Sequence, residues 1–452
     1  MKEGTNQLLT VIKGFLATKD EKHLKQFLLD MHSVDIAEVI SNITDKSDKQ
    51  YLLAQLDSEQ AALVLNELDA EVVADLLQDV SSERVSEILD EMSFDDAADF
   101  LGELSENDKE KFLDLFEDQD AEDVQELMDY REDTAGGIMT TEYVAIPDSI
   151  TAAKAIEVLR ETAPDAETVY YVYVINLKNQ LVGVISLREL IIASPDSIII
   201  DIMRKNVMSV NVNEDQEDVA RLVAKYDFLA VPVVDDKQHL IGIITVDDVI
   251  DVIHEEATED LYRMAGTYEA EEDETLARFS TAFKSRLPWL LITMMGGMLS
   301  GQVLKNFSEQ LNTVVALAFF IPLLIGMGGN VGTQSSTVTV RGIATGQINT
   351  TTVLKTVLRE SMVGISLGTV MGAIVALAAY FWQGSIQLGL VVGLTMFANM
   401  VTAATMGTVV PLLLKKVGVD PATASAPFIT TTIDILGLII YATLATLLLG
   451  IL

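Results

Sequence analysis

The sequence predicts a multidomain membrane protein: an all-α superhelical solenoid, an α/β tandem repeat and a connecting helix, followed by a five-helix transmembrane domain. Three observations predict this fold class. A twelve-residue repeat runs through the N-terminal part, the middle holds an internal duplication, and the C-terminal part holds five long apolar runs. We place the domains at residues 1–131, 132–261, 262–285 and 286–452.

The charge of the 452-residue chain, -38 in total, is divided between two parts. From Arg286 onward there are seven basic and four acidic residues, so the preceding part carries 23 of the 30 basic and 64 of the 68 acidic residues. Such a polyanion repels nucleic acid, which we exclude as a partner, and attracts cations. A surface kept soluble by its charge is the alternative interpretation.

Two further features of composition bound the function. The chain has no cysteine, which excludes both a disulfide framework and a thiolate metal site. The first residues, MKEGTNQLLT, lack a basic start followed by an apolar run. We therefore expect no cleaved signal peptide and a cytosolic N-terminal part.

The N-terminal part repeats with a period of twelve over residues 45–116. A residue suited to a helix N-cap recurs every twelve positions: Asp45, Asp57, Asp69, Ser81, Ser93 and Ser105. Apolar residues follow each cap at seven, eight and eleven positions, which predicts one short amphipathic helix per repeat. A single helix of this kind cannot bury its apolar face alone, so we expect the helices to stack into a solenoid.

The middle part, residues 138–257, holds two copies of a strand, helix, strand, strand, helix pattern, with Gly183 and Gly242 at equivalent turns. This pattern resembles a pair of CBS modules, which are regulatory and often bind adenine nucleotides between the copies. The resemblance implies an ATP-type nucleotide contacted by Gly242, Thr245 and Asp248. In the first copy Ser186 stands at the place of Thr245, and Glu189 replaces the aspartate. A pair of modules that only dimerises is the alternative.

The C-terminal part carries five apolar runs, each close to the ~20 residues that cross a bilayer. They span roughly residues 287–305, 313–340, 361–382, 386–414 and 426–452. The basic residues that flank these runs lie mostly before the first, between the second and third, and between the fourth and fifth. Because basic loops face the cytosol, we expect a cytosolic N-terminus and a C-terminus outside the cell.

Asp434 is the one acidic residue that the sequence places well inside an apolar run. A carboxylate there costs about 3 kcal/mol or more, which favours a functional role over a helix-packing one. Thr430 lies four residues earlier on the same helical face. The second run contains GMGGNVGTQSST, in which Asn330 and Gln334 share a face. Its glycines fit either close helix packing or a pore lining.

The order of these parts resembles the MgtE family of magnesium transporters, most specifically at GGNVGTQ, PFITTTID and AGGIMTTEYVAI. The resemblance implies a homodimer in the cell membrane that carries Mg²⁺ into the cytosol, with Asp434 as the ion site of the pore. Magnesium binds oxygen ligands and keeps its waters, so the backbone near Thr430 and the amide of Asn330 would orient the water shell.

The same resemblance implies that cytosolic Mg²⁺ closes the transporter by bridging acidic residues. These residues are Asp95, Asp99, Glu217, Asp227, Asp248, Asp251, Glu256, Glu259 and Asp260. A helix from about Glu271 to Ser285 would couple them to the first span. The proposed ion-binding and nucleotide-binding roles of Asp248 compete.

Other classes of function fit the sequence less well. All four histidines lie in the soluble part, and no nucleophile–base pair stands out in the spans, so we expect no enzyme activity. A membrane-anchored sensor needs neither a buried aspartate nor a glycine-broken span. A transporter of anions would place basic groups inside the spans, and their centres hold no Lys or Arg. The choice among Mg²⁺, Mn²⁺ and Co²⁺ stays open.

Overall fold

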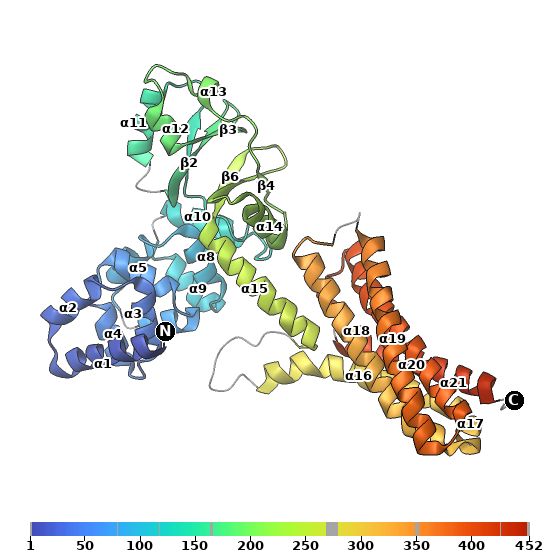
Figure 1. Ribbon diagram of the computed structural model, residues 1–452. Coiled ribbons are helices and arrows are strands. Elements are labelled where there is room, and N and C mark those ends of the chain that lie inside the picture. Colours follow the sequence, from blue (N-terminus) through green and yellow to red (C-terminus); the bar gives the residue numbers. More distant parts are fainter. Residues whose placement is uncertain are drawn as a thin grey trace. The chain divides into compact units, whose positions relative to one another are not determined.

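A computed structural model of the chain (Figure 1) describes residues 2–78, 80–116, 118–162, 166–267, 279–348, 352–424 and 426–449. Internal contacts divide the chain into two units, Met1–Val252 and Ile253–Leu452, and we describe each by itself. The predicted coupling helix falls largely on residues 268–278, which lie outside the described residues.

The described residues of the first unit begin with ten helices, and the twelve-residue repeat explains six of them, α4 to α9. Each of the six predicted caps is the N-cap of a helix, from Asp45 at α4 to Ser105 at α9. The helices are α1 (Lys2–Thr18), α2 (Glu21–Leu29), α3 (Ser33–Ser41), α4 (Lys46–Leu53), α5 (Ser58–Asn66), α6 (Ala70–Leu77), α7 (Ser82–Leu89), α8 (Phe94–Gly102), α9 (Glu106–Leu113) and α10 (Asp118–Met128).

These short helices stack on alternate neighbours, as a solenoid requires. Helix α5 packs between α3 and α7, α4 packs on α6, and α8 packs on α10. The apolar positions of the repeat form the core; Leu52, Val64 and Leu89 are all fully buried. The predicted all-α solenoid is confirmed.

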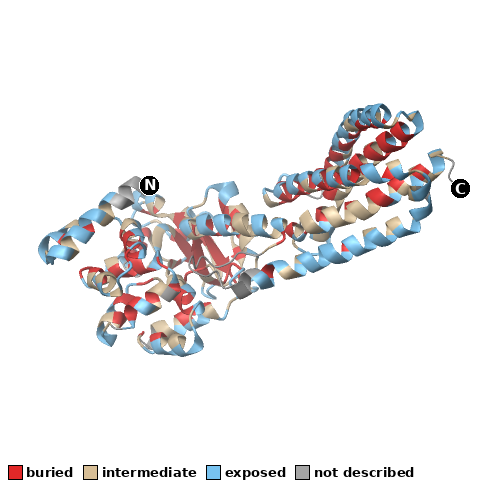
Figure 2. Cartoon of the chain, turned by 90° about the horizontal axis from the view of Figure 1, so that it is seen from below, coloured by how far each residue is buried: buried red, intermediate tan, exposed pale blue. Residues whose placement is uncertain are grey.

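The duplicated middle forms two three-stranded sheets of the same topology, which confirms the α/β repeat. In each sheet the first strand pairs in parallel with the second, which pairs antiparallel with the third. Figure 2 shows buried residues along the strands; β5 and β6 are buried almost throughout, whereas buried and partly exposed residues mix along β1, β2 and β3. The elements are β1 (Tyr143–Pro147), α11 (Ala152–Thr162), β2 (Thr168–Ile175), β3 (Leu181–Ser186), α12 (Leu187–Ile192) and α13 (Ile199–Ile202), then β4 (Val210–Asn211), α14 (Gln216–Tyr226), β5 (Ala230–Val234), β6 (Leu240–Thr245) and α15 (Val246–Ala265).

The two equivalent glycines lie inside strands, not at turns as the sequence suggested. Gly183 is in β3 and Gly242 in β6. A Cβ on Gly242 would meet Sδ of Met139 at 2.7 Å, and one on Gly183 would meet Sδ of Met203. The segment that opens each copy therefore packs on the sheet of the other copy. This exchange requires glycine at both positions.

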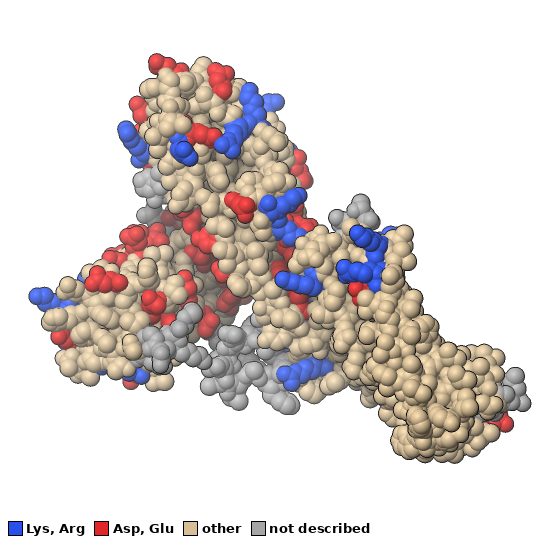
Figure 3. Space-filling model, viewed as in Figure 1, with Lys and Arg blue, Asp and Glu red and all other residues tan. Residues whose placement is uncertain are grey.

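Among its described residues, the second unit contains five helices long and apolar enough to cross a membrane. On the face that Figure 3 shows, few charged side chains lie along the length of this unit. The predicted five-span domain is confirmed. Among the described elements, α20 packs against α18, α19 and α21, and α16 packs against α21. The elements are α16 (Phe279–Asn306), α17 (Ser308–Thr313), η2 (Val315–Phe320), α18 (Ile321–Ala344), α19 (Val353–Gln383), α20 (Ile386–Lys416), η3 (Pro421–Thr423) and α21 (Ala426–Leu449).

The third span begins earlier than the apolar run predicted, and this brings a second acid into a helix of the membrane unit. Glu360 lies two turns inside α19 and is only 8% exposed. Its Oε2 accepts a hydrogen bond from the hydroxyl of Ser335 on α18 at 3.3 Å, and its Oε1 pairs with Arg359. Asp434 is therefore not the only acidic side chain within the span helices.

Candidate functional site

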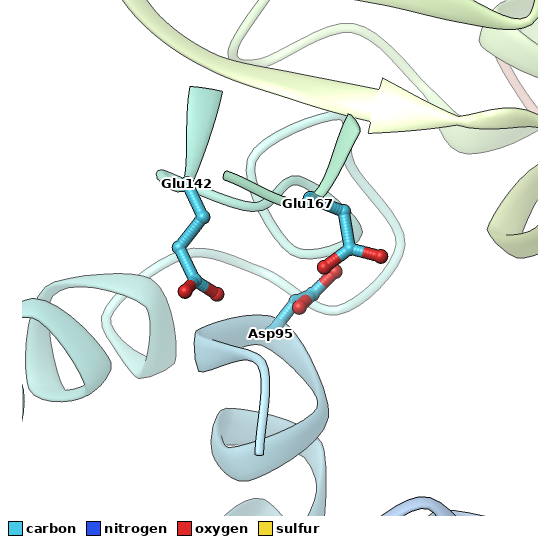
Figure 4. Close-up of side chains that lie close together, drawn as sticks. All are labelled: Asp95, Glu142 and Glu167. Carbon is cyan, nitrogen blue, oxygen red and sulfur yellow. The ribbon is translucent and has the colours of Figure 1, made fainter. Parts of the chain in front are cut away.

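Three carboxylates converge in the first unit: Asp95 in α8, Glu142 just before β1 and Glu167 just before β2 (Figure 4). One oxygen from each lies within 4.8 Å of the others. The sequence singled out only Asp95. Because β1 and β2 are parallel, and Glu167 N donates to Glu142 O at 2.8 Å, the two glutamates lie side by side.

The start of α8 is tied to this group. Glu142 Oε2 accepts a hydrogen bond of 3.0 Å from the backbone N–H of Phe94, the first residue of α8. An unpaired amide at a helix N-terminus is a natural partner for a carboxylate. Asp95, the next residue, is thereby held toward the two glutamates. Its Oδ1 is buried and has no hydrogen-bond partner among the described residues.

The electrostatics of the cluster disfavour three full charges. Burial, then the charge of Asp248, raises the pKa of Asp95 well above its usual value. Loss of hydration beside the surrounding protein, and then the charge of Glu142, raise the pKa of Glu167 to about 7, although its side chain keeps an exposed part. Burial and Asp247 raise the pKa of Asp248 to about 6, against the opposing hydrogen bonds from Thr245. Closely spaced carboxylates of this kind need positive charge beside them. A hard divalent cation that binds oxygen ligands can supply that charge in place of protons.

The other predicted regulatory residues of the first unit lie outside this triad. Asp248 lies in the first turn of α15 and is near enough to raise the pKa of Asp95, and Asp251 is exposed one turn further along. Asp99 is exposed one turn beyond Asp95 on α8. Glu217 forms an ion pair with Arg221, and Asp227 caps α14 in a left-handed conformation at φ 54°.

The remaining predicted regulatory residues, Glu256, Glu259 and Asp260, lie in the C-terminal half of α15, in the second unit. Glu259 pairs with Arg263, and the same guanidinium pairs with Asp420 ahead of the fifth span. All three acids are partly buried. The end of α15 is thus joined to the membrane unit through a charged contact.

A cavity of about 410 Å³ lies between the two copies of the repeat. Ser186 and Glu189 of the first copy line it, together with Arg204 and the stacked rings of Tyr226 and Phe228, whose centroids are 5.5 Å apart. Hydrogen bonds from Ser186 and then from Arg204 lower the pKa of Glu189. The cavity therefore offers aromatic faces, one cation and one ionised carboxylate to a ligand.

The three nucleotide residues predicted in the second copy do not line this cavity. Gly242 is covered by Met139, and the hydroxyl of the buried Thr245 donates a hydrogen bond to Asp248 at the start of α15. Thr245 and Asp248 thus act on each other as a helix cap. Their first-copy equivalents, Ser186 and Glu189, form the same kind of cap but also face the cavity.

In the second unit, Asp434 and Thr430 of α21 both face Gly329 of α18. Measured to the position that a Cβ would take on Gly329, Thr430 Cγ2 lies at 3.1 Å and Asp434 Oδ1 at 3.9 Å. Asp434 Oδ1 is buried and has no hydrogen-bond partner among the described residues. The Thr430 hydroxyl donates to the carbonyl of Ala426 at 2.8 Å. Because Gly329 has no side chain, the carboxylate has space in this contact between α18 and α21, which we call the glycine seam.

Asn330 lies on an exposed face of α18, whereas Asp434 faces the buried Gly329. It follows Gly329 on α18 but is exposed, as is Gln334 one turn later. Adjacent residues on a helix point about 100° apart, so Gly329 and Asn330 present different faces. The shared face of Asn330 and Gln334, predicted from their spacing, is an outer face of the chain.

Three family models match the chain in the order of its parts. The MgtE intracellular N domain matches residues 31–133, the CBS domain matches 135–196 and 199–255, and the model described as "MgtE: Divalent cation transporter" matches 321–444. Together they cover the solenoid from residue 31, both copies of the repeat and most of the membrane unit.

Characterised relatives and solved structures agree with these matches. The magnesium transporter MgtE of Bacillus subtilis is 43% identical over 72% of this chain and 71% of its own, and that of Thermus thermophilus is 41% identical over 72% of both. The crystal structure of the soluble part of a magnesium transporter is 39% identical, with a TM-score of 0.52 over 56% of this chain and 99% of its own. The cytosolic domain of the Mg²⁺ channel MgtE in complex with ATP scores 0.52 at 39% identity, over 54% of this chain and 99% of its own.

Proposed function

The chain belongs to the MgtE family of magnesium transporters, and from this premise we propose that it moves Mg²⁺ across the cell membrane into the cytosol along a path past Asp434. The observation that carries this proposal is the buried Oδ1 of Asp434, which faces Gly329 without a hydrogen-bond donor among the described residues. A carboxylate at this depth costs about 3 kcal/mol or more. A passing cation offsets that cost.

A hydrated ion suits this seam better than a bare one. Magnesium releases its waters reluctantly and is commonly held by one or two carboxylates acting with water. In a homodimer, which we propose, two Asp434 side chains repel each other, and a divalent ion relieves that repulsion best. The exposed Asn330 and the backbone near Thr430 then orient the water shell.

Replacing the pore carboxylate tests the path. We expect Asp434→Ala in the full-length protein, reconstituted in vesicles, to abolish most Mg²⁺ uptake, because the ion loses the carboxylate that faces Gly329. Glu309→Gln, which removes an exposed acid of the same unit, serves as the matched control. Uptake by Asp434→Ala at the level of the control, with unchanged preference among divalent cations, contradicts the proposal.

We further propose that cytosolic Mg²⁺ closes the path by binding the acidic residues of the cytosolic part. The converging carboxylates of Asp95, Glu142 and Glu167 support this proposal. Their mutual repulsion is smallest when a bound cation bridges them. Asp99, Glu217, Asp227, Asp248 and Asp251 extend the acidic surface, and Glu256, Glu259 and Asp260 carry it along α15. The bound ion favours one conformation over another by its difference in affinity for the two.

An adenine nucleotide such as ATP is the proposed ligand of the cavity between the repeat copies. The related cytosolic domain in complex with ATP supports this class of ligand. Tyr226 and Phe228 offer faces for a base, and Arg204 offers a charge for phosphate. Ser186 and Glu189 of the first copy line the cavity, and Gly242, Thr245 and Asp248 of the second copy do not. We therefore propose that the first-copy residues contact the nucleotide.

We propose that the N-terminal and repeat parts face the cytosol and that the C-terminus lies outside, following the basic loops. A membrane-anchored sensor is the rival function. It gives no reason for the buried oxygen of Asp434, and an absence of Mg²⁺ flux in vesicles is the result that favours it.

A further inference from the structure

Five basic side chains gather at one end of the membrane unit, on three neighbouring helices. They are Arg341 in the last turn of α18, Lys355 and Arg359 in the first two turns of α19, and Lys415 and Lys416 in the last turn of α20. All five are exposed. Figure 3 shows basic side chains gathered at this end of the unit. We call these five residues the basic collar.

Close contacts between α18 and α20 place their collar residues at one level. The carbonyl of Gly332 on α18 fills the space beside Gly407 on α20. Arg341 follows Gly332 by nine residues, and Lys416 follows Gly407 by nine residues. At about 1.5 Å per residue, both cations therefore lie roughly 13 Å beyond this contact.

Helix α19 brings the other two cations to the same end. Directly after Arg359, Glu360 accepts a hydrogen bond from Ser335 of α18 at 3.3 Å. The next residue, Ser361, forms a hydrogen bond of 3.0 Å with Thr405 of α20. The start of α19 is thus held against both neighbouring helices, and the collar is one surface.

The collar carries more positive charge than the acids around it neutralise. Within residues 341–416 the sequence contains one acid, Glu360, which is buried and pairs with Arg359 at 3.3 Å. Asp420, which follows α20, pairs with Arg263. The other four collar residues form no ion pair among the described residues. The surface therefore suits an anionic partner.

The length of α19 shows at which depth of a bilayer the collar lies. Arg359 and Trp382 are 23 residues apart on this helix, which is roughly 34 Å. The hydrocarbon core of a bilayer is about 30 Å thick. Trp382 and its neighbours Tyr380 and Phe381 are exposed, as expected of aromatic side chains at a membrane–water interface. With this aromatic end at one interface, the collar lies at the headgroup level of the other.

The face of α19 that carries Lys355 and Arg359 continues as an exposed apolar strip. Residues three or four apart, or seven or eight apart, share a face of a helix. Beyond the two cations this face presents Met362, Val370 and Leu377, all of them exposed. An apolar strip that ends on cations matches a phospholipid, whose acyl chains lie along the strip while its headgroup meets the cations. A free phosphate or an acidic protein segment has no use for the strip.

We propose that the basic collar binds the headgroups of anionic phospholipids in the cytosolic leaflet. This inference rests on the proposed orientation of the chain, which places the collar on the cytosolic side. A Lys or Arg beside an anionic membrane surface contributes about fivefold in affinity. Headgroups that contact the ends of α18, α19 and α20 reduce the repulsion among the cations. Bound lipid therefore stabilises the packing of these three helices.

Thermal unfolding of the full-length protein in neutral detergent micelles, without Mg²⁺, tests the inference. The probe is dioleoylphosphatidylglycerol, and dioleoylphosphatidylcholine is the uncharged comparison. A ligand of the folded state raises the melting temperature as its concentration increases. We expect the anionic lipid to do so, and the variant Lys355→Gln, Lys415→Gln, Lys416→Gln to need on the order of 100-fold more lipid for the same rise. Arg359 stays unchanged because it pairs with Glu360.

Two matched variants serve as controls. The variant Lys22→Gln, Lys25→Gln, Lys305→Gln removes three exposed cations elsewhere and should respond to the anionic lipid as the wild type does. Replacing the three collar lysines by arginine keeps their charge, so this variant should also keep the wild-type response.

Several results would overturn the inference. One is a collar variant that responds like the first control, and another is an equal wild-type response to the two lipids. A wild-type response that soluble glycerol 3-phosphate reproduces shows that free phosphate suffices. A collar variant that is less stable without lipid, yet keeps its response to the anionic lipid, shows that the cations pair with acidic protein segments instead.

A single substitution keeps the test decisive if the triple variant does not fold. Lys355→Gln should need about fivefold more anionic lipid, and an unchanged requirement overturns the inference. The melting temperature involves no ion flux. A failure here therefore leaves the path past Asp434 intact, and a failure of Asp434→Ala to reduce Mg²⁺ uptake leaves the lipid surface intact.

Discussion

At the residue scale, Asp95, Glu142 and Glu167 share a space that holds three full charges only at a cost. One buried oxygen of Asp95 has no partner among the described residues, and the pKa of Glu167 is raised to about 7. Protons and divalent cations are alternative ways to lower this charge. The cluster therefore links the stability of the cytosolic part to both pH and Mg²⁺.

This linkage predicts a pH dependence of stability. A carboxyl whose pKa rises from 4.5 to about 7 on folding binds more protons when folded, so stability falls as pH increases between these values. We expect the melting temperature without Mg²⁺ to fall over this window, and saturating Mg²⁺ to remove most of the fall. Differential scanning fluorimetry of the full-length protein measures both effects.

The control for this prediction removes one charge elsewhere. Glu167→Gln should flatten the pH dependence and weaken the Mg²⁺ effect, whereas Glu110→Gln, at an exposed position on α9, should leave both unchanged. A pH profile in which the two variants coincide would show that Glu167 does not titrate as its surroundings imply.

At the element scale, the two copies of the repeat share a topology but differ in what their helix caps face. Ser186 and Glu189 cap α12 and also line the cavity, whereas Thr245 and Asp248 cap α15 away from it. A strand–helix junction of the same sequence pattern thus gives a ligand surface in one copy and a cap alone in the other.

This difference predicts which copy binds ATP. We expect Phe228→Ala to weaken ATP binding at least about tenfold, because the base loses a stacking surface of the kind that contributes ~0.5–1.5 kcal/mol beyond its buried area. Thr245→Val should bind ATP as the wild type does. Calorimetry with the full-length protein gives both affinities, and the reverse order of the two variants would assign the nucleotide to the second copy.

At the scale of the whole molecule, the chain separates a polyanionic soluble part from an apolar membrane part. The net charge of -38 is concentrated before Arg286. Self-repulsion on this scale opposes a compact state unless counter-ions reduce it. Bound Mg²⁺ is therefore expected to compact the soluble part as well as bridge individual carboxylates.

Protease protection separates specific bridging from general screening of charge. We expect Mg²⁺ to slow proteolysis of the wild-type full-length protein, and the triple variant Asp95→Asn, Glu142→Gln, Glu167→Gln to lose most of this Mg²⁺ response. A matched variant with Glu83, Glu91 and Glu110 changed to Gln removes the same number of charges from exposed positions. Equal responses from the two triple variants would refute a specific site at the cluster.

The sequence by itself determined the helical repeats, the duplicated α/β pattern and the five spans. Each rests on a local period: caps every twelve residues, a strand–helix pattern stated twice, and apolar runs of membrane length. Asp434 was also visible, because a lone charge in an apolar run stands out without any knowledge of its neighbours. These features depend on residues close together in the chain.

Only the tertiary structure brought Glu142 and Glu167 to Asp95, placed the cavity at Ser186 and Glu189, and set the buried Asn399 of α20 between Gly328 of α18 and Gly437 of α21. It also showed Glu360 buried in a helix that the apolar run did not reach. These arrangements depend on which strands pair and which helix faces meet, and residues far apart in the sequence decide both. A neutral asparagine among other polar residues carries no local signal. Asn399 is buried, and its Oδ1 lacks a hydrogen-bond partner among the described residues, only because three helices cross there.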